Sequence, residues 1–346
     1  MILKTNPLDP NPENIAVAAD AIKRGELVAF PTETVYGLGA DATNSVACSK
    51  IFEAKGRPND NPLIVHVCSL EMADKFAHIP EEFRHVIERI WPSPITFIVN
   101  KKRGLSDLAT AGLDTVGLRM PAHKIALKLI EEAGVPLAAP SANKSGRPSP
   151  TTAGDVIEDL DDSIGVVLDG GPSFFGVEST IIDLRSFTVV RPGPFTPEEI
   201  AEKFGRTPLM LKDTESLVKP ISPGLKYRHY APVTPLFLFA GDVSRLKQMS
   251  GGEKRIAFLG SEESCSRIDS TSIEKIAMGS DKDLYSIARN LFGSLRKLDE
   301  LHVNLGLIEP FEEGGIGFAI MNRVRKAAGG RTISDSAELA SLSLET

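Results

Sequence analysis

Residues 26–43, ELVAFPTETVYGLGADAT, join an apolar run to a cluster of hydroxyl-bearing residues. The apolar run is typical of a strand, and the residues before it predict a helix with Asn11 as its cap and Gly25 at its end. Ligands of open α/β sheets bind at the carboxyl ends of strands. The stretch 31–43 is therefore a candidate ligand loop, although a capped turn with a glycine pair explains the same residues.

Predicted helices and strands keep alternating after this stretch, which indicates an α/β fold. Two late strands, 177–184 and 187–193, are close enough to form an antiparallel hairpin, so we expect a twisted mixed sheet, parallel and antiparallel, flanked by helices. Residues 206–221 lack periodicity and carry a proline near each end, as a domain boundary does. A second alternation of strands and helices follows it.

These patterns predict three segments: a first domain at 1–206, a linker at 207–231 and a smaller C-terminal α/β, Rossmann-like domain at 232–346. The linker contains most of SPGLKYRHYAP, residues 222–232, which holds two of the four tyrosines of the chain. A passive tether needs only Gly, Ser and Pro. The linker composition therefore favours a functional role.

The composition is that of an ordinary globular protein, with 42% hydrophobic and 25% charged residues among 346. The three cysteines form no C-x-x-C pair, which excludes a disulfide framework and a zinc site made by cysteines alone. No stretch approaches the ~18 apolar residues of a membrane span, and the first residues lack a signal-like apolar region. We expect a cytoplasmic protein without membrane association.

The net charge of −7 is confined to the first domain, where residues 1–206 carry 21 Lys and Arg against 28 Asp and Glu. Residues 207–346 carry 18 of each, and the linker 207–231 alone has four basic and two acidic residues. Non-specific nucleic-acid binding requires basic patches, so direct nucleic-acid binding should be weak or absent. An anionic ligand would need a local cluster of cations.

Four cations stand next to predicted strand or helix ends: Lys55, Arg57, Arg119 and Arg191. Lys55 and Arg57 belong to KGRPNDNPLIVH, and either anion binding or simple capping of a helix end explains Lys55. Arg119 lies in the apolar strand GLRMP and therefore needs an anionic partner. That partner is either a buried Asp or Glu or a substrate carboxylate.

Other motifs are weaker when taken singly. The polar run PSANKSGRPSPTT, 140–152, precedes a helix predicted to begin near Thr151, a suitable place for phosphate, but polar loops of this kind also occur without function. Gly37-x-Gly39-x-x-Ala42 fits a loose dinucleotide fingerprint without the expected acidic partner. No P-loop, H-E-x-x-H or G-x-S-x-G motif occurs. We therefore expect neither a protein-bound metal nor a covalent nucleophile.

The motifs PTETVYGLGADA, KGRPNDNPLIVH, GLRMP, PSANKSGRPSP, VEST and RPG, in this order, resemble the YrdC-domain family of threonylcarbamoyl-AMP synthases. The linker and the ending GIGFAIMNRVRKAAGGR are similar to the long form of that family. The resemblance implies a nucleotidyltransferase that joins ATP, L-threonine and bicarbonate or carbon dioxide into threonylcarbamoyl-AMP and pyrophosphate. Mg²⁺ would enter with ATP, and no organic cofactor is implied. The product would pass to a tRNA threonylcarbamoyl transferase complex that modifies an adenosine beside the anticodon.

The resemblance also implies site residues. The threonine site would comprise Thr34, His66, Arg119, Ser179 and Thr180, although His66 alone also fits a core histidine. The ATP site would comprise Lys55, Arg57, Asn61, Thr115, Ser141, Asn143, Ser149, Arg191 and Tyr230. Lys55, Arg57 and Arg119 would act in catalysis by offsetting the charge of the gathered anions.

A lid is the role predicted for the linker, with Tyr230, Lys226 and Arg228 folding over the first domain and meeting the nucleotide. Aromatic packing of the linker against the domain surface is the alternative. Two other functions stay open from the sequence: an RNA-binding module, and a nicotinamide oxidoreductase suggested by GLGADA alone. Strongly salt-dependent tRNA binding would favour the first, and cofactor absorbance the second.

Overall fold

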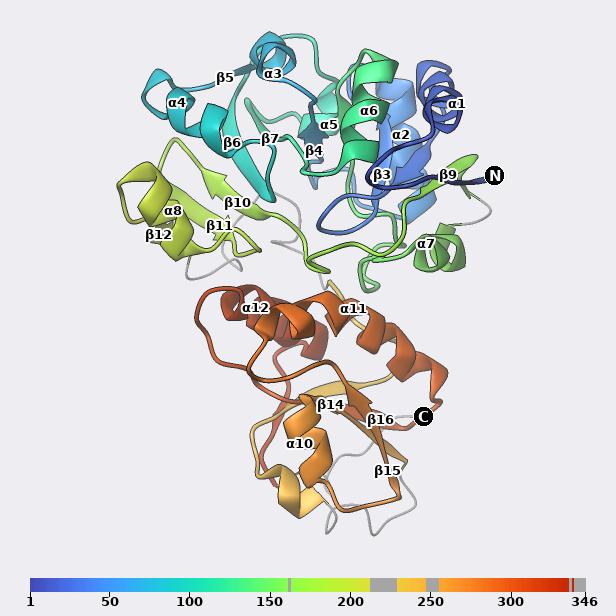
Figure 1. The fold of residues 1–346 in the computed structure, drawn as a ribbon, viewed down its shortest axis with the longest axis vertical. Helices are drawn as coiled ribbons and strands as arrows, with labels where there is room; N and C mark the ends of the chain where they lie inside the picture. The colour runs from blue at the N-terminus through green and yellow to red at the C-terminus, as the bar shows by residue number, and fades with distance from the viewer. Residues whose placement is uncertain (161–162, 212–228, 247–254, 336–337, 339–346) are drawn as a thin grey trace. The chain divides into compact units, whose positions relative to one another are not determined.

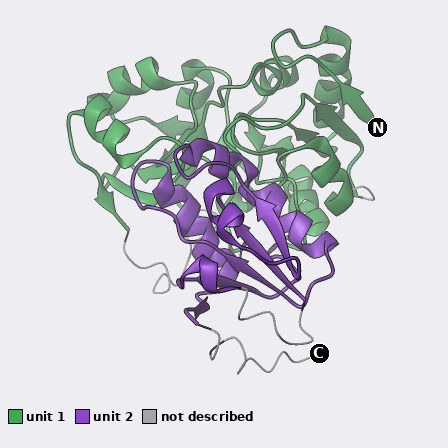
Figure 2. Ribbon diagram, turned by 60° about the horizontal axis from the view of Figure 1, so that its bottom comes forward, with its two compact units in different colours: residues 1–145, 149–227 green, residues 146–148, 228–346 purple. Residues whose placement is uncertain are grey.

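The computed structural model describes residues 1–160, 163–211, 229–246, 255–335 and 338. Its contacts divide the chain into two compact units, coloured separately in Figure 2. Unit 1 comprises 1–145 and 149–227, and unit 2 comprises 146–148 and 228–346. Each unit is an α/β structure with its own sheet, mixed in unit 1 and parallel in unit 2 (Figure 1). The predicted fold class is confirmed.

Unit 1 contains helices that follow the predicted alternation. Asn11 caps the first helix by accepting hydrogen bonds from the amides of Glu13 and Asn14, as its sequence position predicts. The helices are α1 (Pro12–Lys23), α2 (Ser45–Lys55), α3 (Leu70–Phe76), α4 (Glu81–Ile90), α5 (Asp107–Thr110), α6 (Lys124–Ala133), α7 (Ala153–Leu160) and α8 (Pro197–Phe204). Helix α7 begins slightly after Thr151, because the Asp155 carboxylate binds the amides of Thr151 and Thr152.

The strands of unit 1 pair into one mixed sheet over the described residues. Along the sheet they run β1-β9-β2-β3-β8-β4-β7-β6-β10-β11-β12, and β5 pairs with β6. Their bounds are β1 (Ile2–Lys4), β2 (Val28–Phe30), β3 (Gly37–Asp41), β4 (Ile64–His66), β5 (Ala77–His78), β6 (Ile95–Lys101), β7 (Thr115–Arg119), β8 (Leu137–Ala138), β9 (Val166–Asp169), β10 (Thr180–Asp183), β11 (Thr188–Arg191) and β12 (Leu209–Met210). The predicted hairpin is β10–β11, which is antiparallel.

Strand β3 contradicts the dinucleotide interpretation of GLGADA. That fingerprint requires a turn from a strand into a helix, whereas Gly37–Asp41 is itself a strand, antiparallel to β2. A Cβ atom on Gly39 would lie 2.7 Å from Cε1 of Phe30. The glycine therefore allows two strands to pack closely around a phenylalanine ring.

The two faces of the sheet are covered differently. One face packs on the core that includes α2, α4 and α7, with Val65, Phe97 and Leu118 among its strand residues. On the other face, α1 and α6 cover the part formed by β2, β8 and β9. This second face continues over strands β4, β6, β7 and β10. A small apolar cluster lies there, formed by strand residues such as Ile64 and Ile181, and it includes no helix residue from the described part of the chain. This second part of the face is the candidate binding surface.

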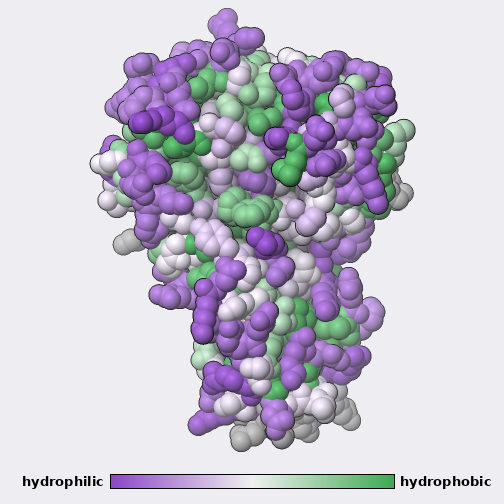
Figure 3. Space-filling model, in the orientation of Figure 1, coloured by the Kyte–Doolittle hydropathy of each residue, from purple (hydrophilic) through white to green (hydrophobic). Residues whose placement is uncertain are grey.

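Unit 2 is a smaller parallel α/β structure. Its strands, in the order β15-β14-β16-β13-β17 across the sheet, are β13 (Leu236–Phe239), β14 (Ile256–Gly260), β15 (Ile273–Ala277), β16 (Leu305–Ile308) and β17 (Thr332–Ile333). Its helices are the 3-10 turn η2 (Val243–Arg245), α10 (Glu262–Arg267), α11 (Leu284–Glu300) and α12 (Gly317–Ala328). Figure 3 shows one face of the whole chain, on which hydrophobic residues are interspersed among hydrophilic ones.

Candidate functional site

Strand register places several predicted site residues on the second face of the unit 1 sheet. His66 pairs with Arg119 between the parallel strands β4 and β7, and Thr115 lies on the same strand and face as Arg119. Next to them Thr96 of β6 pairs with Ile181 of β10, which pairs with Arg191 of β11. A narrow cavity at this face is lined by residues that include Thr96 and Thr115. Polar side chains from four strands, β4, β6, β7 and β11, therefore share one surface.

Two of the loops around this surface are joined through Tyr36. The amide of Tyr36 donates to the carbonyl of Pro150 at 2.9 Å, and its carbonyl accepts from the amide of Ala142 at 2.9 Å. An isolated bridge also pairs Gly37 with Ser141. The hydroxyl of Tyr36 donates to the carbonyl of Gly171 at 2.7 Å. The motifs PTETVYGLGADA and PSANKSGRPSP are therefore neighbours in the fold.

Lys55 connects the end of α2 to the same polar loop. Helix α2 stops at Gly56, which adopts the left-handed conformation, and Lys55 is buried at its last turn. The Nζ atom of Lys55 donates to the carbonyls of Ser141 and Asn143. Burial, followed by the charge of Arg57, holds the pKa of Lys55 well below its usual value. The ammonium group therefore anchors the loop rather than the end of its own helix.

Arg57 and Asn61 form the next turn. The guanidinium of Arg57 donates to the carbonyls of Asn61 and Pro62, at 3.3 Å and 3.1 Å from Nη2. Asn61 is buried, and its Oδ1 atom has no hydrogen-bond partner within the residues that the structure describes. A buried amide oxygen without a partner is costly. This turn therefore presents an unmet acceptor where the ATP site is predicted.

Ser179, Thr180 and Arg191 form a hydroxyl and cation cluster at the start of β10. Nε and Nη2 of Arg191 donate to the carbonyl of Ser179 at 3.1 Å and 2.9 Å, and the hydroxyl of Ser179 lies 2.8 Å from that of Thr96. The hydroxyl of Thr180 donates to the carbonyl of Phe195 at 2.6 Å. The sequence motifs VEST and RPG are therefore one structural element.

Arg119 has the buried acidic partner that the sequence left open. Its Nη2 atom lies 2.7 Å from Oε1 of Glu33, and the side chains are only 5% and 7% exposed. The positive charge of Arg119 is therefore balanced within the protein by the Glu33 carboxylate. Its Nε atom has no hydrogen-bond partner in the described part of the chain, so one donor is still available to a ligand.

His66 is neutral in this environment. Burial, helped by the nearby charge of Arg119, lowers the pKa of His66 to about 3. Its ring meets that of Phe30 edge to face at a centroid distance of 6.2 Å. The Nδ1 atom has no hydrogen-bond partner among the described residues. His66 therefore has both the packing of a core histidine and a polar atom left for a ligand.

The other residues predicted for the threonine and ATP sites have contacts of their own elsewhere in the fold. Thr34 is fully buried with its hydroxyl 2.8 Å from that of Thr32. Ser149 donates to the Glu178 carboxylate at 2.6 Å, and Ser141 donates to Oδ1 of Asn143. Tyr230 belongs to unit 2, where it is buried and stacks on Phe292 at 5.2 Å. Lys226 and Arg228 of the predicted lid lie outside the described residues.

Sequence reasoning missed four side chains of this region: Glu33, Thr96, His123 and Glu178. Glu33 stands between two threonines in PTET, and a lone acidic residue after a buried strand was an available signal. Thr96 is one hydroxyl in an apolar strand, and Glu178 lies beside the predicted Ser179. Only the three-dimensional structure reveals that Glu33, Thr96 and Glu178 contact Arg119, Ser179 and Ser149, respectively. His123 is found only by its place near the charges of Glu33 and Arg119.

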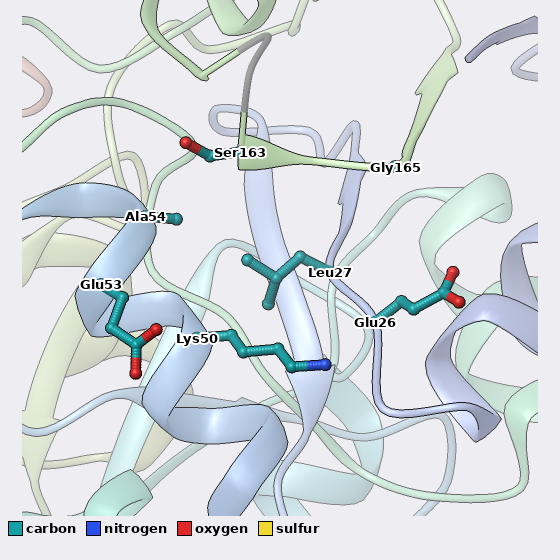
Figure 4. Close-up of a pocket in the computed structure, with 7 residues that line it drawn as sticks. All are labelled: Glu26, Leu27, Lys50, Glu53, Ala54, Ser163 and Gly165. Carbon is teal, nitrogen blue, oxygen red and sulfur yellow. The ribbon is translucent and has the colours of Figure 1, made fainter.

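A larger pocket lies away from this surface. Its volume is about 460 Å³, and its lining residues are Glu26, Leu27, Lys50, Glu53, Ala54, Ser163 and Gly165 (Figure 4). Lys50 is the basic residue of this lining, and it donates to the carbonyl of Gly25 at 2.6 Å. None of the predicted site residues lines it, and two carboxylates make it unsuited to ATP. We therefore place the site on the sheet face.

Unit 2 presents one comparable strand end. At the carboxyl end of β14, the Glu309 carboxylate accepts hydrogen bonds from the amide of Ser261 at 2.6 Å and from the hydroxyl of Ser264 at 2.7 Å. A Cβ atom on Gly260 would lie 2.4 Å from Oε2 of Glu309. Open α/β sheets bind ligands at such strand ends. Here the Glu309 side chain already accepts the hydrogen bonds that Ser261 and Ser264 could otherwise donate to a ligand.

The described residues contain no group of three His, Cys, Asp or Glu side chains arranged to hold a metal ion. Within the same residues, no helix is both long and apolar enough to cross a bilayer.

Comparison with known proteins agrees with this arrangement. Residues 20–193 match the Sua5, YciO and YrdC family model, described as "Telomere recombination". Residues 195–329 match the model described as "Threonylcarbamoyl-AMP synthase, C-terminal domain". The chain belongs to the threonylcarbamoyl-AMP synthase family.

Members of this synthase family match over nearly the full chain. The threonylcarbamoyl-AMP synthase of Bacillus subtilis is 44% identical, with 95% of this chain and 97% of the relative covered. That of Pyrococcus abyssi is 45% identical over 92% of this chain and 95% of its own length. The crystal structure of P. abyssi Sua5 complexed with L-threonine aligns with a TM-score of 0.90 and 42% identity, covering 97% of this chain and 99% of that one. The similarity extends through both units.

Proposed function

We propose that this chain is an ATP-dependent nucleotidyltransferase that condenses L-threonine, bicarbonate or carbon dioxide, and ATP into threonylcarbamoyl-AMP and pyrophosphate. One observation supports this proposal above the others: a relative solved with L-threonine matches both units at 42% identity. The sheet face of this chain adds the expected chemistry, since it gathers hydroxyls, a neutral histidine and buried cations.

The first step of the proposed reaction is carbamate formation. The amino group of threonine, once it has lost a proton, attacks the carbon of carbon dioxide, or of bicarbonate with loss of water. Thr34, His66, Arg119, Ser179 and Thr180 are the residues proposed to hold threonine. Because His66 is neutral, it adds no positive charge that would repel the ammonium form of the substrate.

The second step transfers adenylate. A carbamate oxygen attacks the α-phosphorus of ATP, the bond to the β-phosphate oxygen breaks, and pyrophosphate leaves. We propose that Lys55, Arg57, Asn61, Thr115, Ser141, Asn143, Ser149, Arg191 and Tyr230 hold ATP, which enters with Mg²⁺. The loop held by Lys55 and the turn held by Arg57 fix the backbone around the phosphates. The protein supplies position and charge rather than a nucleophile.

Threonylcarbamoyl-AMP is a mixed anhydride, so its proposed use is transfer of the threonylcarbamoyl group to a tRNA adenosine. That transfer belongs to a separate transferase complex. The excess of acidic residues in 1–206 makes a strong, non-specific contact of this chain with tRNA unfavourable.

The decisive experiment follows pyrophosphate release with threonine, bicarbonate, Mg²⁺ and ATP, omitting each in turn, and identifies the adenylated product by mass spectrometry. We expect release only with the complete mixture. Release that does not depend on threonine would contradict the proposal. Tight, strongly salt-dependent tRNA binding without pyrophosphate release would favour an RNA-binding role instead.

A further inference from the structure

Four side chains beside the sheet face, three of them buried and His123 partly buried, have buried polar atoms without hydrogen-bond partners in the described part of the chain. They are Oε2 of Glu33, Nε of Arg119, Nδ1 of His66 and Nδ1 of His123, whereas Oε1 of Glu33 and Nη2 of Arg119 form an ion pair with each other. Buried polar atoms in proteins are nearly always satisfied by protein, water or ligand. Four such groups at one place indicate a small polar ligand.

These four groups come from separate segments that the fold brings together. Glu33 follows β2, His66 and Arg119 end the adjacent parallel strands β4 and β7, and His123 precedes α6. Glu33 and Arg119 are in ionic contact at 2.7 Å, and their charges both act on the His123 ring. The carbonyl of Glu33 is fixed separately, because it accepts from the amide of Phe175 at 2.8 Å.

Close backbone packing holds this arrangement. A Cβ atom on Gly170 would lie 2.9 Å from Cγ of Pro31 and 3.5 Å from Cε1 of His123. The end of β9 therefore approaches the PTET loop and His123 as only glycine permits.

The charges of this cluster are balanced before any ligand enters. Glu33 contributes one negative charge and Arg119 one positive charge, while burial lowers the pKa of both histidines. A neutral ligand that carries one positive and one negative group fits this balance without burying net charge. An amino acid in its zwitterionic form is such a ligand.

We propose, resting on the proposed function, that Glu33 binds the α-ammonium group of threonine while Arg119 binds its carboxylate. The ammonium meets Oε2 of Glu33, which lies outside the ion pair with Arg119, and the substrate carboxylate meets the Nε donor of Arg119. Glu33 is then a threonine-binding residue and a determinant of amino-acid specificity.

An alternative reading of the same contact predicts the opposite effect. If Glu33 only occupies Arg119 until a substrate carboxylate displaces it, removal of its charge strengthens threonine binding. If Glu33 binds the ammonium, removal of its charge weakens threonine binding. Substitution therefore separates the two roles by the direction of the change.

The first test uses the unmodified chain and needs no variant. Calorimetric titration compares L-threonine with the 2,3-dihydroxy acid of the same configuration, in which a hydroxyl replaces the ammonium group. We expect threonine to bind roughly 10- to 100-fold more tightly, the effect of a hydrogen bond to a charged group. Equal affinity for the two ligands would overturn the proposal.

The second test uses Glu33→Gln, which keeps size and removes charge. We expect KM for threonine to rise roughly 10- to 100-fold and KM for ATP to stay unchanged. The deficit should shrink above the pKa of the threonine amino group, because the uncharged amine needs no carboxylate. Glu33→Asp should recover part of the loss, which a purely structural role would not predict.

Glu26→Gln is the matched control. Glu26 precedes the same strand, is half-exposed and pairs with Arg24 at 2.9 Å, so its charge can be removed without touching the site. Its KM for threonine should equal that of the unmodified chain. Thermal melting of all variants checks the fold.

The outcomes separate this inference from the proposed function. If the unmodified chain turns over and Glu33→Gln keeps or lowers KM for threonine at every pH, the Glu33 proposal is wrong and the proposed function stands. If the unmodified chain neither binds threonine nor releases pyrophosphate with it, both are wrong.

Discussion

Arg119 and Glu33 form a buried ion pair between two strand ends, with Nη2 and Oε1 2.7 Å apart. Arg119→Met should lower the free energy of unfolding by about 3–5 kcal/mol, because it leaves a buried carboxylate without its counter-charge. Denaturant unfolding measures the change. The double variant Glu33→Gln/Arg119→Met should regain much of the stability without regaining threonine-dependent turnover. Failure of the double variant to regain stability would contradict this account of the pair.

His66 should make stability depend on pH. Burial lowers its pKa in the folded state to about 3, below the 6.5 of an exposed histidine, so the unfolded state binds more protons between these values. Stability is therefore fully present above pH 6.5 and is lost as pH falls towards 3, with a slope of up to about 1.4 kcal/mol per pH unit.

The variant His66→Gln tests this dependence. Urea unfolding at pH 7 and pH 5 should show a smaller loss for His66→Gln than for the unmodified chain. His78→Gln, which changes an exposed histidine, is the control and should follow the unmodified chain. An identical pH dependence in His66→Gln would show that another group is responsible.

Gly193 joins the RPG turn to the start of β10. A Cβ atom there would lie 2.3 Å from the amide nitrogen of Thr180 and 2.7 Å from the carbonyl oxygen of Glu178. Gly193→Ala should therefore separate Arg191 from Ser179, cost about 1–3 kcal/mol of stability and reduce turnover. Gly154→Ala, within α7, is the control. Its new Cβ would lie at an ordinary 3.6 Å from its nearest neighbour, so this variant should keep both its stability and its turnover. Equal behaviour of the two variants would refute the argument.

The sequence predicted the fold class because strand and helix periodicity is local, and Asn11, Gly25 and the β10–β11 hairpin appear where local signals placed them. The sequence singled out candidate site residues whose chemistry is conspicuous, such as Arg119. The partner of Arg119 was not, because four strands, β3 to β6, lie between Glu33 and β7 in the sequence, and the two residues meet only through the fold of the sheet. Thr96 was missed for the same reason, since its partner Ser179 is 83 residues away.

Tyr230 offers the last test, because packing and nucleotide contact make different demands on its ring. Within unit 2 it has a positive φ of 64°, stacks on Phe292 and lies beneath the guanidinium of Arg323 at 5.8 Å. Tyr230→Phe keeps the ring and removes only the hydroxyl, so it should leave stability nearly unchanged and raise KM for ATP if the hydroxyl meets the nucleotide. Phe292→Leu disturbs the stacking and keeps the hydroxyl of Tyr230, so its main effect should be a lower melting temperature. If Tyr230→Phe retains the KM for ATP and Phe292→Leu lowers the melting temperature, the tyrosine serves packing alone and the predicted nucleotide contact is wrong.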